Sequence, residues 1–337
     1  MIIVIQVLVL LPRDVENQEP LLSQKKTVRG SKKGSARKLP KGIPSDTKAG
    51  QVVFDADLVE AKPEGKELEL WSARAVSPKA VGEWTLDDVR VKFYASNGVV
   101  YTVTGKTGGV QTETYAMWVR GNVITRSSNG YTFKSESVFY DPKAKRLSAP
   151  TAVQMEGPVD KEGARLELVG EGMTADMGTN QLKIAKDVKA KRHIPHGRIA
   201  QIQSNTALFS GKTNSAQFSG AVVIDIEAMR ITGPRAEFAY DPATGTLDSV
   251  EVVGGVRVTE ADRFATSGSL SIHFRDDRYV FRGTPRVVQV DDELFGDEII
   301  FLDGGKKVQV LNVKAQIDPE RVGRDNREQV PNKGEKP

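Results

Sequence analysis

The chain has 337 residues, 39% of them hydrophobic, and it contains no cysteine, which excludes disulfides, thiolate metal sites and cysteine nucleophiles. Residues 1–50 carry ten Lys or Arg against four Asp or Glu, a net charge of +6. The whole chain has a net charge of +4, which leaves −2 for the remainder. Binding to a nucleic-acid duplex needs a basic patch on the folded part, so we expect no nucleic-acid partner.

The length fits about two domains of roughly 150 residues each. Residues 1–11, MIIVIQVLVLL, are almost wholly apolar. As a helix they would extend about 16 Å, against about 30 Å for the hydrocarbon core of a bilayer. They are either a frayed apolar terminus or the remnant of an N-terminal membrane anchor whose beginning is missing. We favour the remnant, because exposing so many consecutive apolar side chains to water is unfavourable. Residues 12–50 are predicted to be a basic flexible linker, and residues 318–337 a disordered tail.

Between these termini, apolar and polar residues alternate with a period of two, and turn residues interrupt the pattern every eight to twelve positions. This pattern predicts antiparallel strands joined by tight hairpin turns, and therefore an all-β fold. A short helix over 71–80 is the helical alternative, and Pro78 limits it. The predicted strands cover residues 89–95, 98–105, 130–141, 220–228, 249–260, 268–276 and 278–283.

One turn sequence occurs twice, as FYDPKAKRL at 139–147 and as AYDPATGTL at 239–247. Each copy lies in a longer unit that starts with Gly-x-Val. These units cover 121–153, 220–253 and, more loosely, 255–288. In both turns the proline sets φ, and the aspartate before it is placed to accept hydrogen bonds from the following backbone. A single hairpin is marginal alone, whereas stacked hairpins share one apolar face and stabilise each other.

No constellation of residues indicates catalysis or metal binding. His193 and His196 lie in HIPH, which reads as a loop and lacks a third ligand. The GKT sequences at 105–107 and 211–213 lack the spaced glycine and the strand-to-helix context of a phosphate-binding loop. The acidic residues between 291 and 298 flank turns and are expected to form a solvated face. We therefore expect no enzyme activity, no metal site and no cofactor.

Weak motifs follow one another in the first half of the chain. They are Trp71 with Ala73 and Ala75, Phe93-Tyr94 before Asn97-Gly98, Gly121-x-Val123, Gly130-Tyr131, Tyr140-Asp141, Ala149-Pro150 before Val153, and Gly172-Met173. In this order they resemble LptC, the periplasmic component of the lipopolysaccharide export machine, over residues 51–192.

The second half, residues 198–317, is similar to the related LptA/OstA-type domain. Its most specific motif is GDEIIFLDGGKKVQVLNV at 296–313. The other matching features are Gly220-x-Val222, Ala236-x-Phe238, Tyr240-Asp241-Pro242 and Gly254-Gly255-Val256-x-Val258.

The resemblance implies two tandem twisted antiparallel β-jellyrolls, each a half-open clasp with an apolar inside. They would be an LptC-like module over 51–195 and an LptA/OstA-like module over 196–317. The usual family member carries one such module after its anchor, whereas this chain carries two. The resemblance also implies a periplasmic protein anchored to the inner membrane by its N-terminus. Its expected partners are the inner-membrane ABC transporter of lipopolysaccharide export and, by edge-strand docking, an LptA-like or outer-membrane bridge jellyroll.

The implied function is a transport bridge that covers the lipid A acyl chains of lipopolysaccharide and passes them from the transporter towards the outer membrane. We expect residues 51–317 to form one continuous apolar groove. Two other readings are a non-catalytic β-solenoid scaffold of the cell envelope, with a filled interior, and an enzyme acting on surface polysaccharide. The alternation leaves open which face of each strand lines the groove, because a register slip of one residue exchanges the two faces. The candidate groove residues are Val138, Tyr140, Tyr131, Phe133, Val222, Ile224, Phe238, Tyr240, Ile272, Phe274 and Phe281.

Overall fold

The computed structural model describes residues 51–62, 65–77, 82–157, 165–194, 198–240, 247–261, 263–273, 276–290, 292–302, 307–312 and 314–316. The expected anchor remnant, basic linker and C-terminal tail lie outside these residues. Within them no helix is long and apolar enough to cross a membrane.

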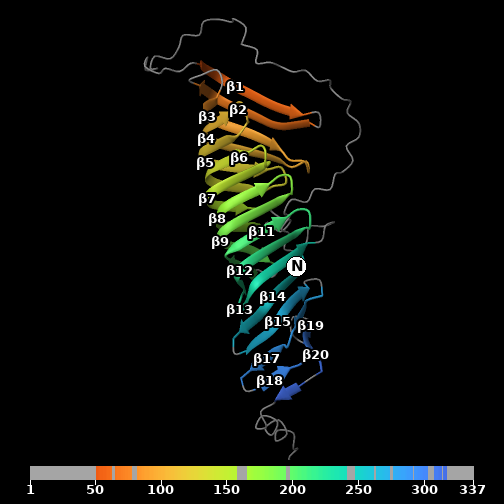
Figure 1. The fold of residues 1–337 in the computed structure, drawn as a ribbon. Coiled ribbons are helices and arrows are strands. Elements are labelled where there is room, and N and C mark those ends of the chain that lie inside the picture. Colours follow the sequence, from red (N-terminus) through yellow and green to blue (C-terminus); the bar gives the residue numbers. More distant parts are fainter. Residues whose placement is uncertain are drawn as a thin grey trace, which may run out of the picture.

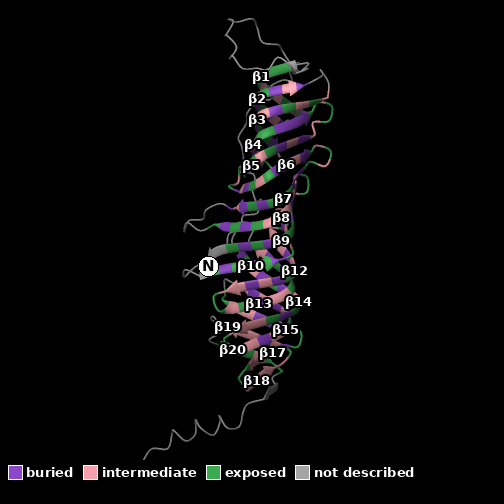
Figure 2. Cartoon of the chain, turned by 90° about the vertical axis from the view of Figure 1, so that its left-hand side faces the viewer, coloured by how far each residue is buried: buried purple, intermediate pink, exposed green. Residues whose placement is uncertain are grey.

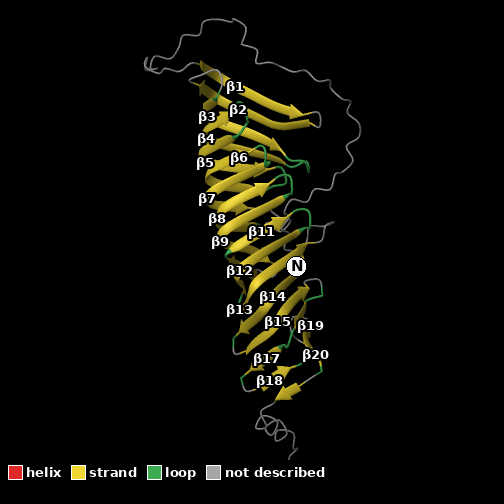
Figure 3. Ribbon diagram, in the orientation of Figure 1, coloured by secondary structure: helices red, strands yellow, loops and turns green. Residues whose placement is uncertain are grey.

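The predicted all-β fold is confirmed, because the described part of the chain forms one antiparallel sheet of 21 strands (Figure 3). The short helix considered over 71–80 is not formed by residues 71–77, which belong to strand β2. The first nine strands are β1 (Gln51–Lys62), β2 (Gly65–Ser77), β3 (Glu83–Tyr94), β4 (Val100–Gln111), β5 (Met117–Ser127), β6 (Thr132–Asp141), β7 (Arg146–Glu156), β8 (Leu166–Asp176) and β9 (Gln181–Ile194). The others are β10 (Arg198–Ser204), β11 (Thr206–Ser210), β12 (Ser215–Ile226), β13 (Met229–Tyr240), β14 (Leu247–Glu260), β15 (Arg263–His273), β16 (Arg278–Arg282), β17 (Arg286–Gln289), β18 (Asp292–Phe295), β19 (Glu298–Leu302), β20 (Lys307–Leu311) and β21 (Lys314–Gln316).

The strands stack across a long column that runs from β1 at one end to β18 and β20 at the other (Figure 1). From β1 to β9 each strand pairs with the next one along the chain. The ladder continues without interruption into the second half, because β9 pairs with both β10 and β11, and these two strands both pair with β12. One hydrogen-bonded sheet therefore spans the two halves of the sequence.

Most long strands change register near their middle. Examples are the shifts between Arg120 and Val123 in β5 and between Ser219 and Val222 in β12. At the same level the single strand opposite β9 is split into β10 and β11, and the one opposite β15 into β16 and β17. These breaks divide the sheet lengthwise into two walls. Wall A holds the strand halves that end in the turns near residues 97, 129, 227, 261 and 291. Wall B holds those that end near 113, 143, 178, 212 and 276.

The Gly-x-Val that opens the first two predicted repeat units lies at this bend. Gly121 and Gly220 have φ of 83° and 80°, a region that glycine enters without steric cost. A side chain at residue 220 would also collide with Asn205, because a Cβ built there lies 2.6 Å from the Asn205 Nδ2. The repeated glycine is thus explained by the geometry of the fold, since it bends each strand from one wall into the other.

The hydrophobic core lies between the walls and extends along the column (Figure 2). Phe93 of wall A and Tyr140 of wall B meet across it with ring centroids 4.4 Å apart. The turn after Tyr140 forms as expected, because Asp141 Oδ1 accepts hydrogen bonds from the amides of Lys143 and Ala144 at 2.9 and 3.1 Å. The matching turn at Asp241 and Pro242 lies outside the described residues.

Candidate binding cleft

The predicted groove residues point into the interior between the two walls. The ten described ones expose between 1% and 8% of their surface. Phe274 lies outside the described residues. Tyr131, Phe133, Val222 and Ile224 come from wall A, and Val138, Tyr140, Phe238, Tyr240, Ile272 and Phe281 come from wall B. These side chains are buried, and most of them pack against one another in the hydrophobic core.

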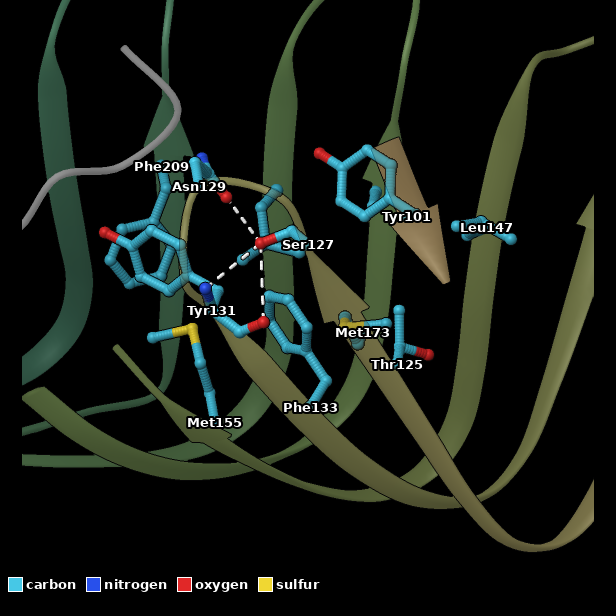
Figure 4. A pocket seen from close by; sticks show the side chains of 12 residues that line it. Tyr101, Thr125, Ser127, Asn129, Tyr131, Phe133, Leu147, Met155, Met173 and Phe209 are labelled. Carbon is cyan, nitrogen blue, oxygen red and sulfur yellow. Dashed lines mark hydrogen bonds between the residues drawn. The ribbon is translucent and has the colours of Figure 1, made fainter. Parts of the chain in front are cut away.

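In the first half of the column, buried apolar side chains from both walls form the interior. A cavity of about 20 Å³ lies between the walls there, close to the volume that one water molecule needs (Figure 4). Tyr131 and Phe133 line it from wall A, and Phe209 lines it from wall B. The strand end carrying Tyr131 is held by Ser127, whose Oγ accepts a hydrogen bond from the Tyr131 amide at 3.1 Å and donates one to Asn129 Oδ1.

Two buried tyrosines in this part, Tyr101 and Tyr140, have raised pKa values. Burial raises the pKa of Tyr101 to about 12. Burial, followed by the negative charges of Glu67, Glu60 and Asp141, raises the pKa of Tyr140 to about 12. Because neither hydroxyl loses its proton near neutral pH, neither can act as a general base there. Both side chains contribute apolar surface and a neutral hydroxyl to the interior.

The open edges of the two walls, which we call lips, are joined in the first half of the column. The β3–β4 turn belongs to the lip of wall A, and the β8–β9 turn belongs to the lip of wall B. Asn97 Nδ2 donates a hydrogen bond to Asn180 Oδ1 at 3.1 Å, and Ser96 Oγ donates one to the Met177 carbonyl at 3.5 Å. These contacts close the clasp at this level.

The walls separate in the second half and enclose a cleft of about 550 Å³. Beyond β15, the strands β17, β18 and β21 continue wall A, and β16, β19 and β20 continue wall B. The two sets pair only within their own wall among the described residues. The chain crosses between the walls at Gly283, whose backbone approaches that of Gly268, with the Gly268 amide donating to the Gly283 carbonyl at 2.9 Å. Short strands that are not shared by the two walls leave room between them.

Apolar side chains from both walls line this C-terminal cleft, and its volume lies in the range of small-molecule sites. Phe281 and Phe301 of wall B contact edge to face, with ring centroids 5.7 Å apart. The other apolar residues that line the cleft are Ile226, Met229, Val258, Phe264, Ala265, Leu270, Tyr279, Val287, Leu294 and Val308. Burial is less complete here than in the rest of the column, as β17 and β18 show in Figure 2.

Of these residues, the sequence prediction named Phe281 alone. Tyr279 could have been found, because it lies two positions before Phe281 and shares its strand face. Phe301 could also have been found, because it is an aromatic residue within the most specific motif of the second half. Leu294 and Val258 carry no comparable signal, since their place at the cleft depends on the distance between the walls.

Charged residues surround the apolar surface of the cleft. Asp292 and Glu293, from the acidic stretch predicted to be a solvated face, line the cleft. Glu293 forms an ion pair with Arg286, and Glu298 forms one with Arg282 at 2.5 Å. In the part of the chain that the structure describes, no group of three or more metal-ligating side chains comes together. The apolar lining of the cleft is suited to holding an apolar ligand.

Comparisons with known proteins agree with the order of motifs in the sequence. The family described as "Lipopolysaccharide-assembly, LptC-related" matches residues 32–194, and the family described as "LptA/(LptD N-terminal domain) LPS transport protein" matches residues 201–304. Among solved structures, the chain is similar to LptH from Pseudomonas aeruginosa, described as the LptA homologous periplasmic component of the conserved lipopolysaccharide transport device. That likeness has 16% identity and a TM-score of 0.32, and it covers 36% of this chain and 95% of LptH.

No curated protein matches the chain. The two family matches nevertheless confirm the resemblance seen in the sequence, in the same order along the chain. Residues 32–194 therefore match the LptC-related lipopolysaccharide-assembly family, and residues 201–304 match the LptA/LptD N-terminal family.

Proposed function

We propose that this protein is a periplasmic component of the lipopolysaccharide transport bridge that shelters lipid A acyl chains between its two walls without catalysing a reaction. The observation that carries the proposal is the apolar cleft of about 550 Å³ at the C-terminal end of a sheet built from two lipopolysaccharide-transport families. Each methylene removed from water there contributes roughly 0.8 kcal/mol. The sugar head group can stay in water at the open lips.

A continuous path for the acyl chains through both halves forms part of this proposal. The unbroken ladder from β9 to β12 supports it, since the interior runs across the junction of the two family regions. In the first half, however, a cavity between the walls holds only about 20 Å³, and the lips are joined by Asn97 and Asn180. Passage there requires the walls to part. Crosslinkers at Val138 and Phe238 test this step, and the continuous path fails if neither captures lipopolysaccharide during transport.

The proposed partners dock on the free edges of the sheet. Among the described strands β1 pairs only with β2, and at the other end β20 and β21 each pair with a single strand. Unpaired edges offer backbone groups for strand addition. We assign the β1 end to the inner-membrane ABC transporter and the β20–β21 end to an LptA-like or outer-membrane bridge jellyroll. The N-terminal residues, outside the described part, would anchor the chain to the inner membrane.

A non-catalytic scaffold is the competing function. It requires an interior filled by side chains, and the first half of the column meets that requirement. The C-terminal cleft does not, because its apolar lining would be left exposed without a ligand. An experiment in the cleft therefore distinguishes lipid transport, which requires a bound lipid there, from a scaffold, which does not.

Site-specific photo-crosslinking in the cleft tests the proposed function directly. A benzoylphenylalanine at Tyr279 or Leu294 is expected to give a light-dependent lipopolysaccharide adduct in cells that express the full chain. The matched control is the same residue at Val169, which faces solvent on the outer surface and is 45% exposed. Equal labelling at all three positions, or no labelling in the cleft of a folded and membrane-associated protein, would reject lipid transport through this cleft.

A further inference from the structure

The mouth of the C-terminal cleft carries a strong imbalance of charge. Five acidic side chains line the cleft against one basic side chain, Arg263. The acidic residues are Glu227, Glu260, Asp277, Asp292 and Glu293. This is unexpected beside a site for a phosphorylated lipid, because like charges repel across a shared low-dielectric surface.

The acidic residues lie at the lips and flank the opening from both sides. Glu227 is in the β12–β13 turn and Glu260 ends β14, both on the lip of wall A. Asp277 is in the β15–β16 turn on the lip of wall B. An anionic group that entered between the lips would therefore face carboxylates from both walls.

Ion pairs neutralise only part of this charge. Arg263 Nε donates to Glu260 Oε2 at 3.0 Å, and Arg286 pairs with Glu293. Glu227 and Asp277 make no hydrogen bond or ion pair with any described residue. Both are exposed, and both have positive φ, of 53° and 45°, as tight hairpin turns require. Because both side chains also line the cleft, their charges are not offset there by an ion pair with a described residue.

We propose that this acidic mouth selects amphiphiles by head-group charge, favouring a cationic or uncharged head beside the apolar chains and disfavouring a phosphate dianion there. The inference rests on the proposed function in one respect, that the cleft holds an acylated amphiphile. For a phosphorylated lipid, the mouth keeps the phosphates turned away into solvent while the acyl chains enter the cleft. Amine-masked or dephosphorylated lipids are the class it accepts best.

The test compares three ligands that share one alkyl chain: dodecyltrimethylammonium, dodecyl maltoside and dodecyl phosphate. Each is titrated calorimetrically into the full chain below its micellar concentration, with a chelator present so that no divalent cation bridges phosphate to carboxylate. We expect affinity to fall in that order. The differences should narrow as salt is raised, since the Debye length shortens from about 30 Å at 0.01 M to about 8 Å at 0.15 M.

A second experiment removes the negative charges of Glu227 and Asp277 at the opening of the cleft. The Glu227→Gln/Asp277→Asn variant is expected to lower the ratio of cationic to phosphate affinity by about two- to fivefold, the scale of exposed charge interactions. The control is Glu113→Gln/Glu251→Gln, which removes the same charge from exposed positions away from the cleft and should leave the ratio unchanged. An equal fall in both variants would overturn the proposal, because it would show a net-charge effect.

The remaining outcomes separate this inference from the proposed function. If all three ligands bind equally, or if the phosphate binds best, head-group selection is wrong even when lipopolysaccharide adducts form in the cleft. If no ligand binds and no adduct forms, the cleft is not a lipid site, and the proposed function fails together with the inference.

Discussion

Asn97 and Asn180 are 83 residues apart in the sequence, and their side-chain amides form a 3.1 Å hydrogen bond that joins the two lips of the clasp. The contact links the β3–β4 turn to the β8–β9 turn, so strands that are not neighbours in the sheet are held together. It marks the level at which the interior is closed.

A double-mutant cycle measures the strength of this lip contact. Asn97→Ala, Asn180→Ala and the double variant are expected to show a coupling free energy of about 0.5–1.5 kcal/mol, the net value of a typical hydrogen bond. The cycle is needed because Asn97 Oδ1 also accepts a hydrogen bond from the Val99 amide at 3.1 Å. Denaturant unfolding followed by circular dichroism supplies the four free energies. Additive effects would show that the lips are not coupled through this pair.

The bend at Gly220 is predicted to be intolerant of any side chain. Gly220→Ala adds a Cβ that meets Asn205 at 2.6 Å, as well as strain at φ of 80°. Gly98→Ala is a matched control, because φ is 81° there and no atom lies within 4 Å of the added Cβ. We expect Gly220→Ala to be less stable than Gly98→Ala by at least about 1 kcal/mol, the lower end of overpacking costs. Equal thermal stabilities would contradict the role given to this bend.

Acid sensitivity is predicted for the β8–β9 turn. The amides of Thr179 and Gly178 donate to Asp176 Oδ1 at 2.8 and 3.1 Å, and Arg146 lies 3.3 Å from Oδ2. The hydrogen bond from the Thr179 amide is the largest cause that lowers the pKa of Asp176 below its ordinary value of 3.8, and the bonds from Arg146 and Gly178 add to it. A depressed folded-state pKa stabilises the protein above the unfolded value, and this stability is lost as pH falls through the folded value.

The wild-type chain should therefore be more stable than Asp176→Asn at neutral pH, and the difference should disappear as pH falls below about 4 and both side chains become neutral. Melting temperatures of the two proteins across this pH range test the prediction. A difference that stays constant with pH would show that the charge of Asp176 contributes nothing.

Polar substitution in the cleft is predicted to weaken lipid capture without unfolding the chain. Leu294 lines the cleft and is only half-buried, so Leu294→Asn should keep the fold. An amide placed against acyl chains costs about 1–3 kcal/mol, so photo-crosslinking from Tyr279 should fall at least about fivefold. Val169→Asn, on the outer surface, serves as the control and should not reduce the yield. Unchanged capture in Leu294→Asn would place the acyl chains elsewhere.

The alternating pattern was sufficient to predict the strands and which residues of a strand share one face. Val138 and Tyr140 alternate with Phe139, and the structure buries the first two while leaving Phe139 half-exposed. This worked because the face of a strand residue depends on the pleat alone, which repeats every two residues whatever the strand packs against. The turn at Asp141 was also predictable, because its hydrogen bonds span only three residues.

The alternating pattern could not predict whether the interior is a packed core or an open cleft. Tyr140 and Phe281 both alternate inward, but Tyr140 packs against Phe93 in a filled core and Phe281 lines an open cleft. The difference arises from the distance between two walls whose facing strands are not neighbours along the chain. A strand pattern contains no information about that distance.

The sequence by itself determined the all-β class, the residues that share one face of a strand and the order of the two families, because each of these depends on local periodicity or on short motifs. Only the tertiary structure decided that the lips meet at Asn97 and Asn180 and that the walls part beyond β15. It also placed Glu227 and Asp277 on opposite sides of one opening. These relationships depend on how far each wall is twisted and where the strands split, and they are set by packing over the whole sheet.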